Sequence, residues 1–108
     1  MKVAIASTGN TLESNIDTSF GRCAWFIIVD TESGAMEFIP NTNRDMEEHV
    51  GKAAVELVAT RNVEMIVSGE FGLKIKPLLD SMHIQMVVIE DSEKKINDII
   101  ALLNNRRK

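Results

Sequence analysis

Residues Ala24–Ile39 read AWFIIVDTESGAMEFI, and this stretch decides the fold class. Two apolar runs, 24–30 and 35–39, are separated by the short polar segment 31–34, which ends in a glycine. Two runs of β-forming residues around a short glycine-containing turn are typical of a β-hairpin. The stretch therefore predicts two neighbouring antiparallel strands, the second of which ends at residues 40–41.

Further elements are predicted on both sides of this hairpin. Lys2–Ser7 is short and apolar, which indicates a strand, and the polar segment Thr8–Phe20 that follows it is a long loop. After the hairpin, a polar loop leads into apolar spacings of three and four, and helices then alternate with short apolar runs. The predicted elements there are a helix from about His49, a strand over Val63–Val67, a helix over Lys74–Met82, a strand over Ile84–Ile89 and a last helix capped by Asp91 or Ser92.

The predicted order is β-β-β-α-β-α-β-α. The first three strands are expected to be antiparallel, whereas strands that alternate with helices are expected to be parallel and joined by right-handed crossovers. We therefore expect an α/β fold with a mixed five-stranded sheet, ribonuclease-H-like by analogy of architecture. It forms a single domain over residues 1–103, followed by a basic C-terminal tail at 104–108.

Composition narrows the classes of function. The chain has 108 residues, with 12 Lys and Arg against 16 Asp and Glu, and a net charge of −4. A mildly acidic domain does not suit general nucleic-acid binding, which needs a concentrated basic face. No apolar segment is long enough for a membrane span or a secretory signal, so a cytoplasmic protein without a membrane partner is expected. The single cysteine excludes an intramolecular disulfide and a four-thiolate metal site.

Known catalytic patterns are missing from the sequence. Nucleases of this architecture use carboxylates that converge on two metal ions. The first predicted strand has none, and the fourth has only Glu64. No Gly-rich nucleotide-binding motif and no G-x-S-x-G is present. We therefore expect a protein that is not an enzyme.

Asp17-Thr-Ser-Phe-Gly-Arg-Cys23 is the first of three candidate site segments. Open α/β sheets place ligands at loops of this kind. Arg22 offers five donors to an anion, and Cys23 is a candidate thiolate ligand if a positive neighbour lowers its pKa. Alternatively, Asp17 and Arg22 form a local ion pair, and Cys23 is a small buried hydrophobe at the start of a strand.

The second and third segments lie at predicted helix starts. Backbone N–H groups near Gly51, together with Lys52, attract anions, and His49 is a candidate ligand for a soft metal. Gly69 and Gly72 form a small anion nest before the next helix. The alternative interpretations are a solvated histidine in a polar loop and a tight connection between strand and helix.

The whole sequence up to residue 103 resembles the dinitrogenase iron–molybdenum cofactor biosynthesis family. The block Asp17-x-x-Phe-Gly-Arg-Cys23 is the most specific part of the resemblance. The other matching segments are Ile5-Ala6-Ser7 with Gly9, Gly51-x-Ala53-Ala54, and Val67-Ser68-Gly69-x-x-Gly72.

The resemblance implies the ribonuclease-H-like fold. It also implies binding or carrying of an iron–molybdenum or related metal–sulfur cluster, or its precursor, without turnover. Our own chemical inference is that Cys23 and His49 are the inner-sphere ligands. The cluster-binding residues would then be Arg22, Cys23, His49, Gly51, Lys52, Gly69 and Gly72.

Two other functions stay open at this stage. The first is an adaptor or regulator in metallocluster assembly that binds a protein partner, such as an ATPase or a cluster-assembly protein. The acidic segment Asp45-Met-Glu-Glu48 motivates this hypothesis. The second is a small-molecule enzyme with Cys23 as its nucleophile, which would need a nearby base and a lowered thiol pKa.

Overall fold

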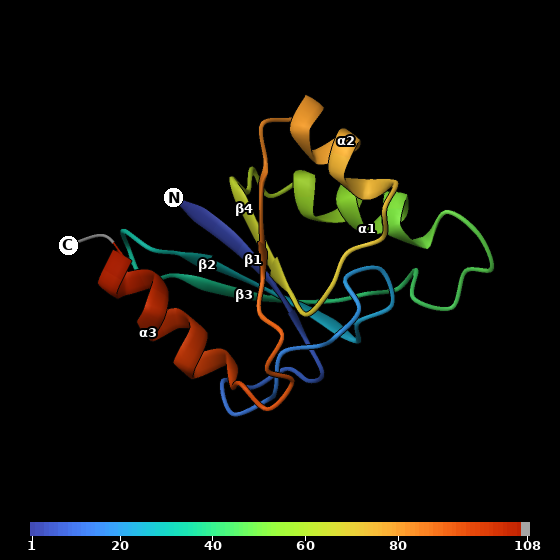
Figure 1. Cartoon of the computed structure of the whole chain (residues 1–108). Helices are drawn as coiled ribbons and strands as arrows, with labels where there is room; N and C mark the ends of the chain where they lie inside the picture. Colours follow the sequence, from blue (N-terminus) through green and yellow to red (C-terminus); the bar gives the residue numbers. More distant parts are fainter. Residues whose placement is uncertain (107–108) are drawn as a thin grey trace.

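A computed structural model of the chain describes residues 1–106 and confirms the predicted order of elements (Figure 1). The first half contains three strands, and helices then alternate with strands. The elements are β1 (Lys2–Ser7), β2 (Trp25–Asp30), β3 (Met36–Pro40), α1 (Val50–Ala59), β4 (Met65–Ser68), α2 (Ile75–Ser81), β5 (Gln85–Val88) and α3 (Ile96–Arg106).

The five strands form one mixed sheet in the order β3-β2-β1-β4-β5. The pairs β1–β2 and β2–β3 are antiparallel, and the pairs β1–β4 and β4–β5 are parallel. The hairpin is therefore β2–β3, and β1 is the strand where the antiparallel and parallel halves meet. The predicted α/β class and mixed sheet are confirmed, whereas the ribonuclease-H-like label stays a prediction.

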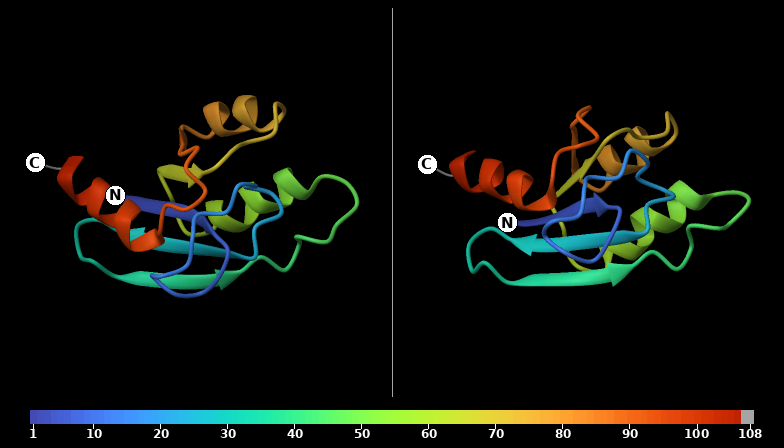
Figure 2. Two further views of the ribbon diagram at one scale, coloured as in Figure 1. Left: turned by 60° about the horizontal axis from the view of Figure 1, so that its bottom comes forward. Right: turned by 90° about the horizontal axis from the view of Figure 1, so that it is seen from below.

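Helices cover both faces of the sheet (Figures 1 and 2). Because successive strand residues point to opposite faces, Ala4 and Ala6 of β1 belong to the core under α1 and α2, while Val3 and Ile5 belong to the core under α3. The first core also contains Phe20, an aromatic residue from the loop after β1. A central strand buried on both faces explains why Lys2–Ser7 reads as a continuous apolar run.

The loop between β1 and β2 is held against the ends of the parallel strands. Ile16 is buried in the core under α3, and Phe20 is buried in the core under α1 and α2. Asp17 donates its N–H to the Ala6 carbonyl (2.9 Å) and accepts the Gly69 N–H at its own carbonyl (3.0 Å). The loop is thus anchored in both cores, and it is hydrogen-bonded to the end of β1 and to the residue that follows β4. This is the edge of the sheet where the parallel strands end.

Two details of the C-terminal region differ from the predictions. The last helix begins at Ile96, so neither Asp91 nor Ser92 caps it. Asp91 instead accepts the Glu93 N–H at its carboxylate (3.0 Å) and the Lys94 N–H at its carbonyl (3.1 Å), which makes a turn. The predicted tail at 104–108 overlaps the end of α3, and residues 107–108 lie outside the described part of the chain.

No helix in residues 1–106 has both the length and the apolar character that crossing a membrane requires.

Candidate functional site

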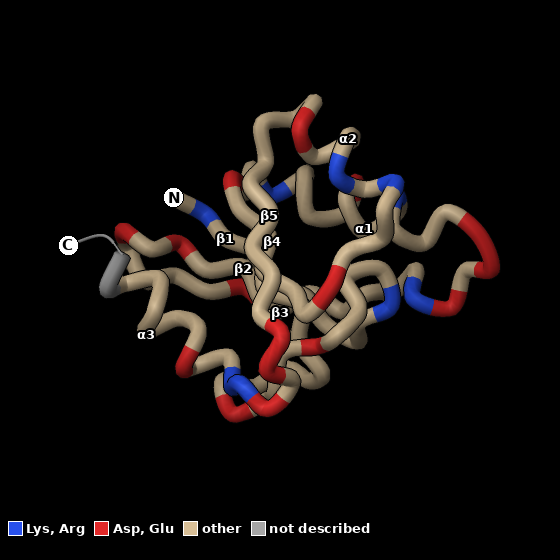
Figure 3. The backbone as a smooth tube through the Cα atoms, viewed as in Figure 1, with Lys and Arg blue, Asp and Glu red and all other residues tan. Residues whose placement is uncertain are grey.

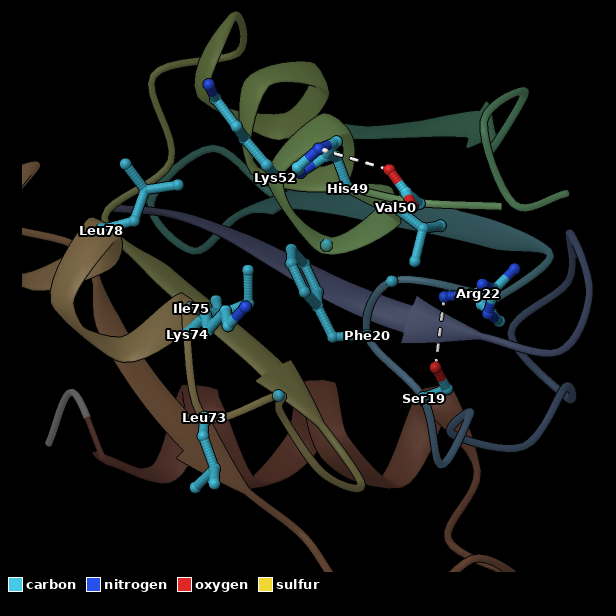
Figure 4. A pocket seen from close by; sticks show the side chains of 14 residues that line it. Ser19, Phe20, Arg22, His49, Val50, Lys52, Leu73, Lys74, Ile75 and Leu78 are labelled. Carbon is cyan, nitrogen blue, oxygen red and sulfur yellow. Dashed lines mark hydrogen bonds and ion pairs between the residues drawn. The ribbon is translucent and has the colours of Figure 1, made fainter. Parts of the chain in front are cut away.

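A broad open cleft of about 990 Å³ lies where the loop after β1 meets the first turns of α1 and α2 (Figure 4). Its position follows from the topology, because the loops that follow parallel strands gather at one edge of the sheet. The lining residues are Ser19, Phe20, Gly21, Arg22, Glu48, His49, Val50, Gly51, Lys52, Gly72, Leu73, Lys74, Ile75 and Leu78.

The floor of the cleft is apolar. The Phe20 side chain lies between the start of α1 and the start of α2, near Val50 and Ile75 (Figure 4). Its ring packs at 5.5 Å from the Phe26 ring and at 5.4 Å from the Phe71 ring, measured between centroids. These aromatic contacts fix Phe20 in place, so the floor is a rigid surface.

Two glycines allow the loop and α1 to approach closely. A Cβ atom on Gly21 would lie 3.2 Å from both N and Cα of Gly51 and 3.3 Å from Cγ1 of Val50. A Cβ atom on Gly51 would lie 2.7 Å from Cδ1 of Ile75. The missing side chains bring the loop, α1 and α2 together around the floor of the cleft.

The rim of the cleft is rich in positive charge. Arg22, Lys52 and Lys74 have exposed side chains and line the cleft from three different segments. Figure 3 shows basic positions at the start of α2 and in the loop before β2, and acidic positions in the loop before α1. One acidic residue, Glu48, also lines the cleft, and its carboxylate lies 3.9 Å from Nε2 of His49. The local charge is therefore opposite in sign to the net charge of the chain.

The start of α1 adds hydrogen-bond donors to this rim. The first intrahelical bond runs from the Ala53 N–H to the His49 carbonyl (3.0 Å). Within the described chain, the N–H groups of Val50, Gly51 and Lys52 have no hydrogen-bond acceptor, as is usual in a first helical turn. His49 precedes them with φ of 60°, a left-handed conformation, and its side chain is exposed. Cationic side chains and the positive end of α1 thus line the same cleft.

Cys23 does not lie in the cleft. It has no exposed surface, and its thiol donates a hydrogen bond to the Phe20 carbonyl (3.4 Å). Burial, reinforced by the negative charge of Asp17, raises the pKa of the Cys23 thiol to about 12. A buried thiol that holds its proton is neither a ready metal ligand nor a nucleophile. The geometry agrees with the alternative interpretation, a small buried hydrophobe.

The predicted ion pair between Asp17 and Arg22 is also not found in residues 1–106. The Asp17 carboxylate instead accepts the Ser19 N–H (3.1 Å). The Arg22 guanidinium donates from Nη1 to the Arg44 carbonyl (2.9 Å). The loop is thus closed by hydrogen bonds to backbone groups, not by an internal pair of charges.

The two glycines of the third segment have different places. Gly72 lines the cleft, and a Cβ atom there would have its nearest neighbour at 3.9 Å. Gly69 lies outside the cleft lining and against the loop backbone, where a Cβ atom would be 2.6 Å from Cα of Thr18. Gly69 therefore has a packing role, as the interpretation of a tight connection predicts.

The structure thus brings Arg22, His49, Gly51, Lys52 and Gly72 together and leaves Cys23 and Gly69 outside. Within residues 1–106, no three His, Cys, Asp or Glu side chains are grouped so as to hold a metal ion. Three further lining residues, Phe20, Ile75 and Lys74, are not among the predicted site residues. Phe20 belongs to the first candidate segment and Lys74 follows the third within two residues, whereas Ile75 was missed by the sequence reasoning.

Comparison with known proteins places this chain in a family. Residues 1–106 match the family described as dinitrogenase iron-molybdenum cofactor. The chain belongs to this family. An uncharacterized protein of Methanocaldococcus jannaschii, MJ0580, is 32% identical over 89 residues, which is 80% of this chain and 72% of that protein.

Solved structures of this family's fold resemble the chain over almost its whole length. The apo form of the orange protein from Desulfovibrio gigas has a TM-score of 0.89 at 20% identity and covers 98% of this chain and 88% of its own. A NifB-like protein from Thermotoga has a TM-score of 0.80 at 28% identity, with 98% and 89% covered. The first likeness shows the fold alone, and the second also agrees with the family assignment.

Proposed function

We propose that this member of the dinitrogenase iron–molybdenum cofactor family binds and carries an iron–molybdenum or related metal–sulfur cluster, or its precursor, in the cleft. It does so without chemical turnover. The observation that carries this proposal is the cleft itself, which combines a rigid apolar floor with a cationic rim at the start of α1. The proposal also rests on the family to which residues 1–106 belong.

The chemistry of the cleft suits a preassembled anionic cluster. Sulfide-coated clusters are anionic and polarizable, so one surface can rest on Phe20 and Ile75 while the charge faces Arg22, Lys52 and Lys74. His49 is the one side chain of the lining that could bind a soft metal directly. A cluster that already holds its own sulfide needs few protein ligands. Cationic side chains and backbone N–H groups that donate hydrogen bonds are enough to hold it.

Anaerobic titration with tetrathiomolybdate, followed by its absorption spectrum and by gel filtration, tests the proposal. The wild-type protein should retain the coloured ion. Arg22→Ala should weaken binding by about tenfold, which is the size of one charge-assisted contact. Arg61→Ala is the matched control, because Arg61 lies outside the cleft lining and pairs with Glu37 at 3.0 Å. Absence of binding by the wild-type protein, or equal loss in both variants, would contradict the proposal.

The role of His49 needs its own variant. An alanine at φ of 60° would be strained, whereas asparagine tolerates the left-handed conformation. His49→Asn therefore removes the imidazole with little effect on the start of α1. If His49 is a metal ligand, this variant should shift the absorption bands of the bound ion. An unchanged spectrum would mean that His49 does not ligate the metal and that the ion is held only by the cationic and backbone donors of the cleft.

A second candidate function is that of an adaptor in metallocluster assembly. The acidic segment 45–48 is exposed along its whole length, includes the exposed Met46, and lies directly before α1. Such a segment suits a partner with a basic surface. Recovery of one ATPase or cluster-assembly protein in a pull-down, with no metal in the anaerobically purified chain, would favour this function over cluster carriage.

A further inference from the structure

Asn41 links the loop before β2 to the loop before α1, and both loops contribute residues to the cleft lining, although Asn41 itself does not. It is only 3% exposed. Its Nδ2 atom donates to the carbonyl of Gly21 (3.0 Å) and to the carbonyl of Cys23 (2.9 Å). Its Oδ1 atom accepts the Asn43 N–H (3.3 Å). Both donors and the acceptor of the side-chain amide are therefore used, and they join segments far apart in the sequence.

Backbone bonds around Asn41 complete this link. The Asn41 N–H donates to the Ala24 carbonyl (3.0 Å), and the Arg44 N–H donates to the Asn41 carbonyl (3.3 Å). The second bond closes a turn over 41–44. The Arg44 carbonyl at the end of this turn is the group that accepts the bond from Arg22 Nη1.

The Arg22 side chain thus depends on Asn41 at both ends. Asn41 holds the backbone on either side of Arg22 through the Gly21 and Cys23 carbonyls. It also holds the turn that presents the Arg44 carbonyl to the guanidinium. A long exposed arginine is otherwise free to adopt many rotamers, and fixing it in advance lowers the entropy cost of binding.

We propose that Asn41 is a positioning residue for anion binding in the cleft, acting through Arg22. The inference rests on the proposed function and extends it to a residue outside the cleft. An aspartate is no substitute, because its carboxylate would place an acceptor against two carbonyl oxygens.

The experiment compares tetrathiomolybdate binding by the wild-type protein, Asn41→Ala and Asn43→Ala. Asn43 is the matched control, since it lies in the same turn and its side chain makes no hydrogen bond within the described chain. Asn41→Ala should raise the dissociation constant by about tenfold, as expected for one displaced charge-assisted contact. Asn43→Ala should change it by less than about twofold.

A double-mutant cycle separates positioning from general loss of structure. In the Arg22→Ala background, Asn41→Ala should have almost no further effect on binding. Val58→Ala is a core substitution near the end of α1, away from the cleft lining. It is a control for lowered stability and should bind tetrathiomolybdate as the wild type does. Wild-type affinity in Asn41→Ala, or an equal loss with and without Arg22, would overturn the inference. Absence of binding by the wild-type protein would instead overturn the proposed function, and this inference with it.

The protein without ligand gives an independent readout. Because Asn41 holds the Cys23 carbonyl, Asn41→Ala should speed the reaction of Cys23 with Ellman's reagent in native buffer more than Val58→Ala does. Equal rates in these two variants would show that Asn41 contributes only to overall stability.

Discussion

The two glycines of the Gly69-x-x-Gly72 segment have different surroundings. Gly69 lies against the backbone of Thr18, which cannot move without displacing the loop that carries Phe20. Gly72 lies at the open cleft and has free space around it. The sequence motif therefore combines one packing requirement with one position that contacts the cleft.

We expect Gly69→Ala to lower the free energy of unfolding by about 1–3 kcal/mol, as overpacking does in other proteins. Gly72→Ala should change it by less than about 0.5 kcal/mol. Urea unfolding followed by Trp25 fluorescence measures both. Equal stability of the two variants would show that the loop backbone at Thr18 can move to accommodate a Cβ atom on residue 69 without loss of stability.

The buried thiol of Cys23 predicts a loss of stability at alkaline pH. Its pKa is raised from 9.0 to about 12, so the protein holds the proton more tightly than the unfolded chain does. A raised folded pKa gives stability that is complete below the unfolded value and is lost as the pH rises toward the folded value.

Between pH 9 and pH 12, the wild-type protein should therefore lose up to about 1.4 kcal/mol per pH unit relative to Cys23→Ala. The chain has no tyrosine, which simplifies the alkaline titration. Denaturant unfolding at a series of pH values measures the difference. Parallel pH profiles of the two proteins would show that the thiol is accessible to water.

The elements divide the molecule into a side that carries the cleft and a side that only supports the sheet. α1 and α2 contribute to the cleft, whereas α3 packs its apolar stripe on the opposite face of the sheet. Ile99 of α3 is 1% exposed, and Ile75 of α2 is 8% exposed and lines the cleft.

This division predicts that Ile99→Ala lowers stability by about 2–5 kcal/mol but leaves tetrathiomolybdate binding within about twofold at temperatures where the variant is folded. Ile75→Ala should reduce both stability and binding, because it removes part of the floor. Calorimetry and the binding titration together test the pair. A binding defect in Ile99→Ala would mean that the two faces are coupled through the sheet.

Local patterns predicted the elements, while contacts between distant segments decided the details. The apolar runs at 2–7 and 24–39, together with the apolar spacings and short apolar runs after His49, contain enough information for every strand and helix. The cap at Asp91 was predicted wrongly, because the same carboxylate that favours a helix start also closes a turn. Asn15 and Lys95 form an isolated β-bridge just before α3, and no local pattern records such a contact.

The same reasoning applies to the candidate site. Arg22, His49 and Lys52 could be predicted because they follow strands or begin a helix, where topology exposes them. The burial of Cys23 was one of two interpretations that the sequence left open, because the choice depends on how the loop packs into the core under α1 and α2. Asn41 gave no signal, since the carbonyls that it binds come from a segment earlier in the chain.

At the scale of the whole molecule, the net charge of −4 and the basic rim of the cleft make opposite predictions for salt. If the net negative charge of the protein dominates, it repels an anion, and added salt screens this repulsion and strengthens binding. If the positively charged rim dominates, it attracts the anion, and added salt screens this attraction and weakens binding.

We expect the second outcome. We suggest a titration from about 50 to about 500 mM NaCl, a range over which the Debye length falls from roughly 14 to 4 Å. The dissociation constant for tetrathiomolybdate should rise over this range. The rise should be smaller in Arg22→Ala than in Arg61→Ala. Binding that is unchanged or tighter in high salt would show that the rim does not hold the anion by its charge.

The close approach of Gly21 and Gly51 has a consequence for how relatives of this chain diverge. A side chain on Gly21 would meet the backbone of Gly51, whereas a side chain on Gly51 would meet the side chain of Ile75. A lineage that gains a side chain at position 21 must therefore first move the loop of Phe20 away from α1, and one that gains a side chain at position 51 must first find a smaller or differently placed residue at position 75. Tolerance at position 51 is thus conditional on the residue at position 75, which is epistasis imposed by close packing between two helices.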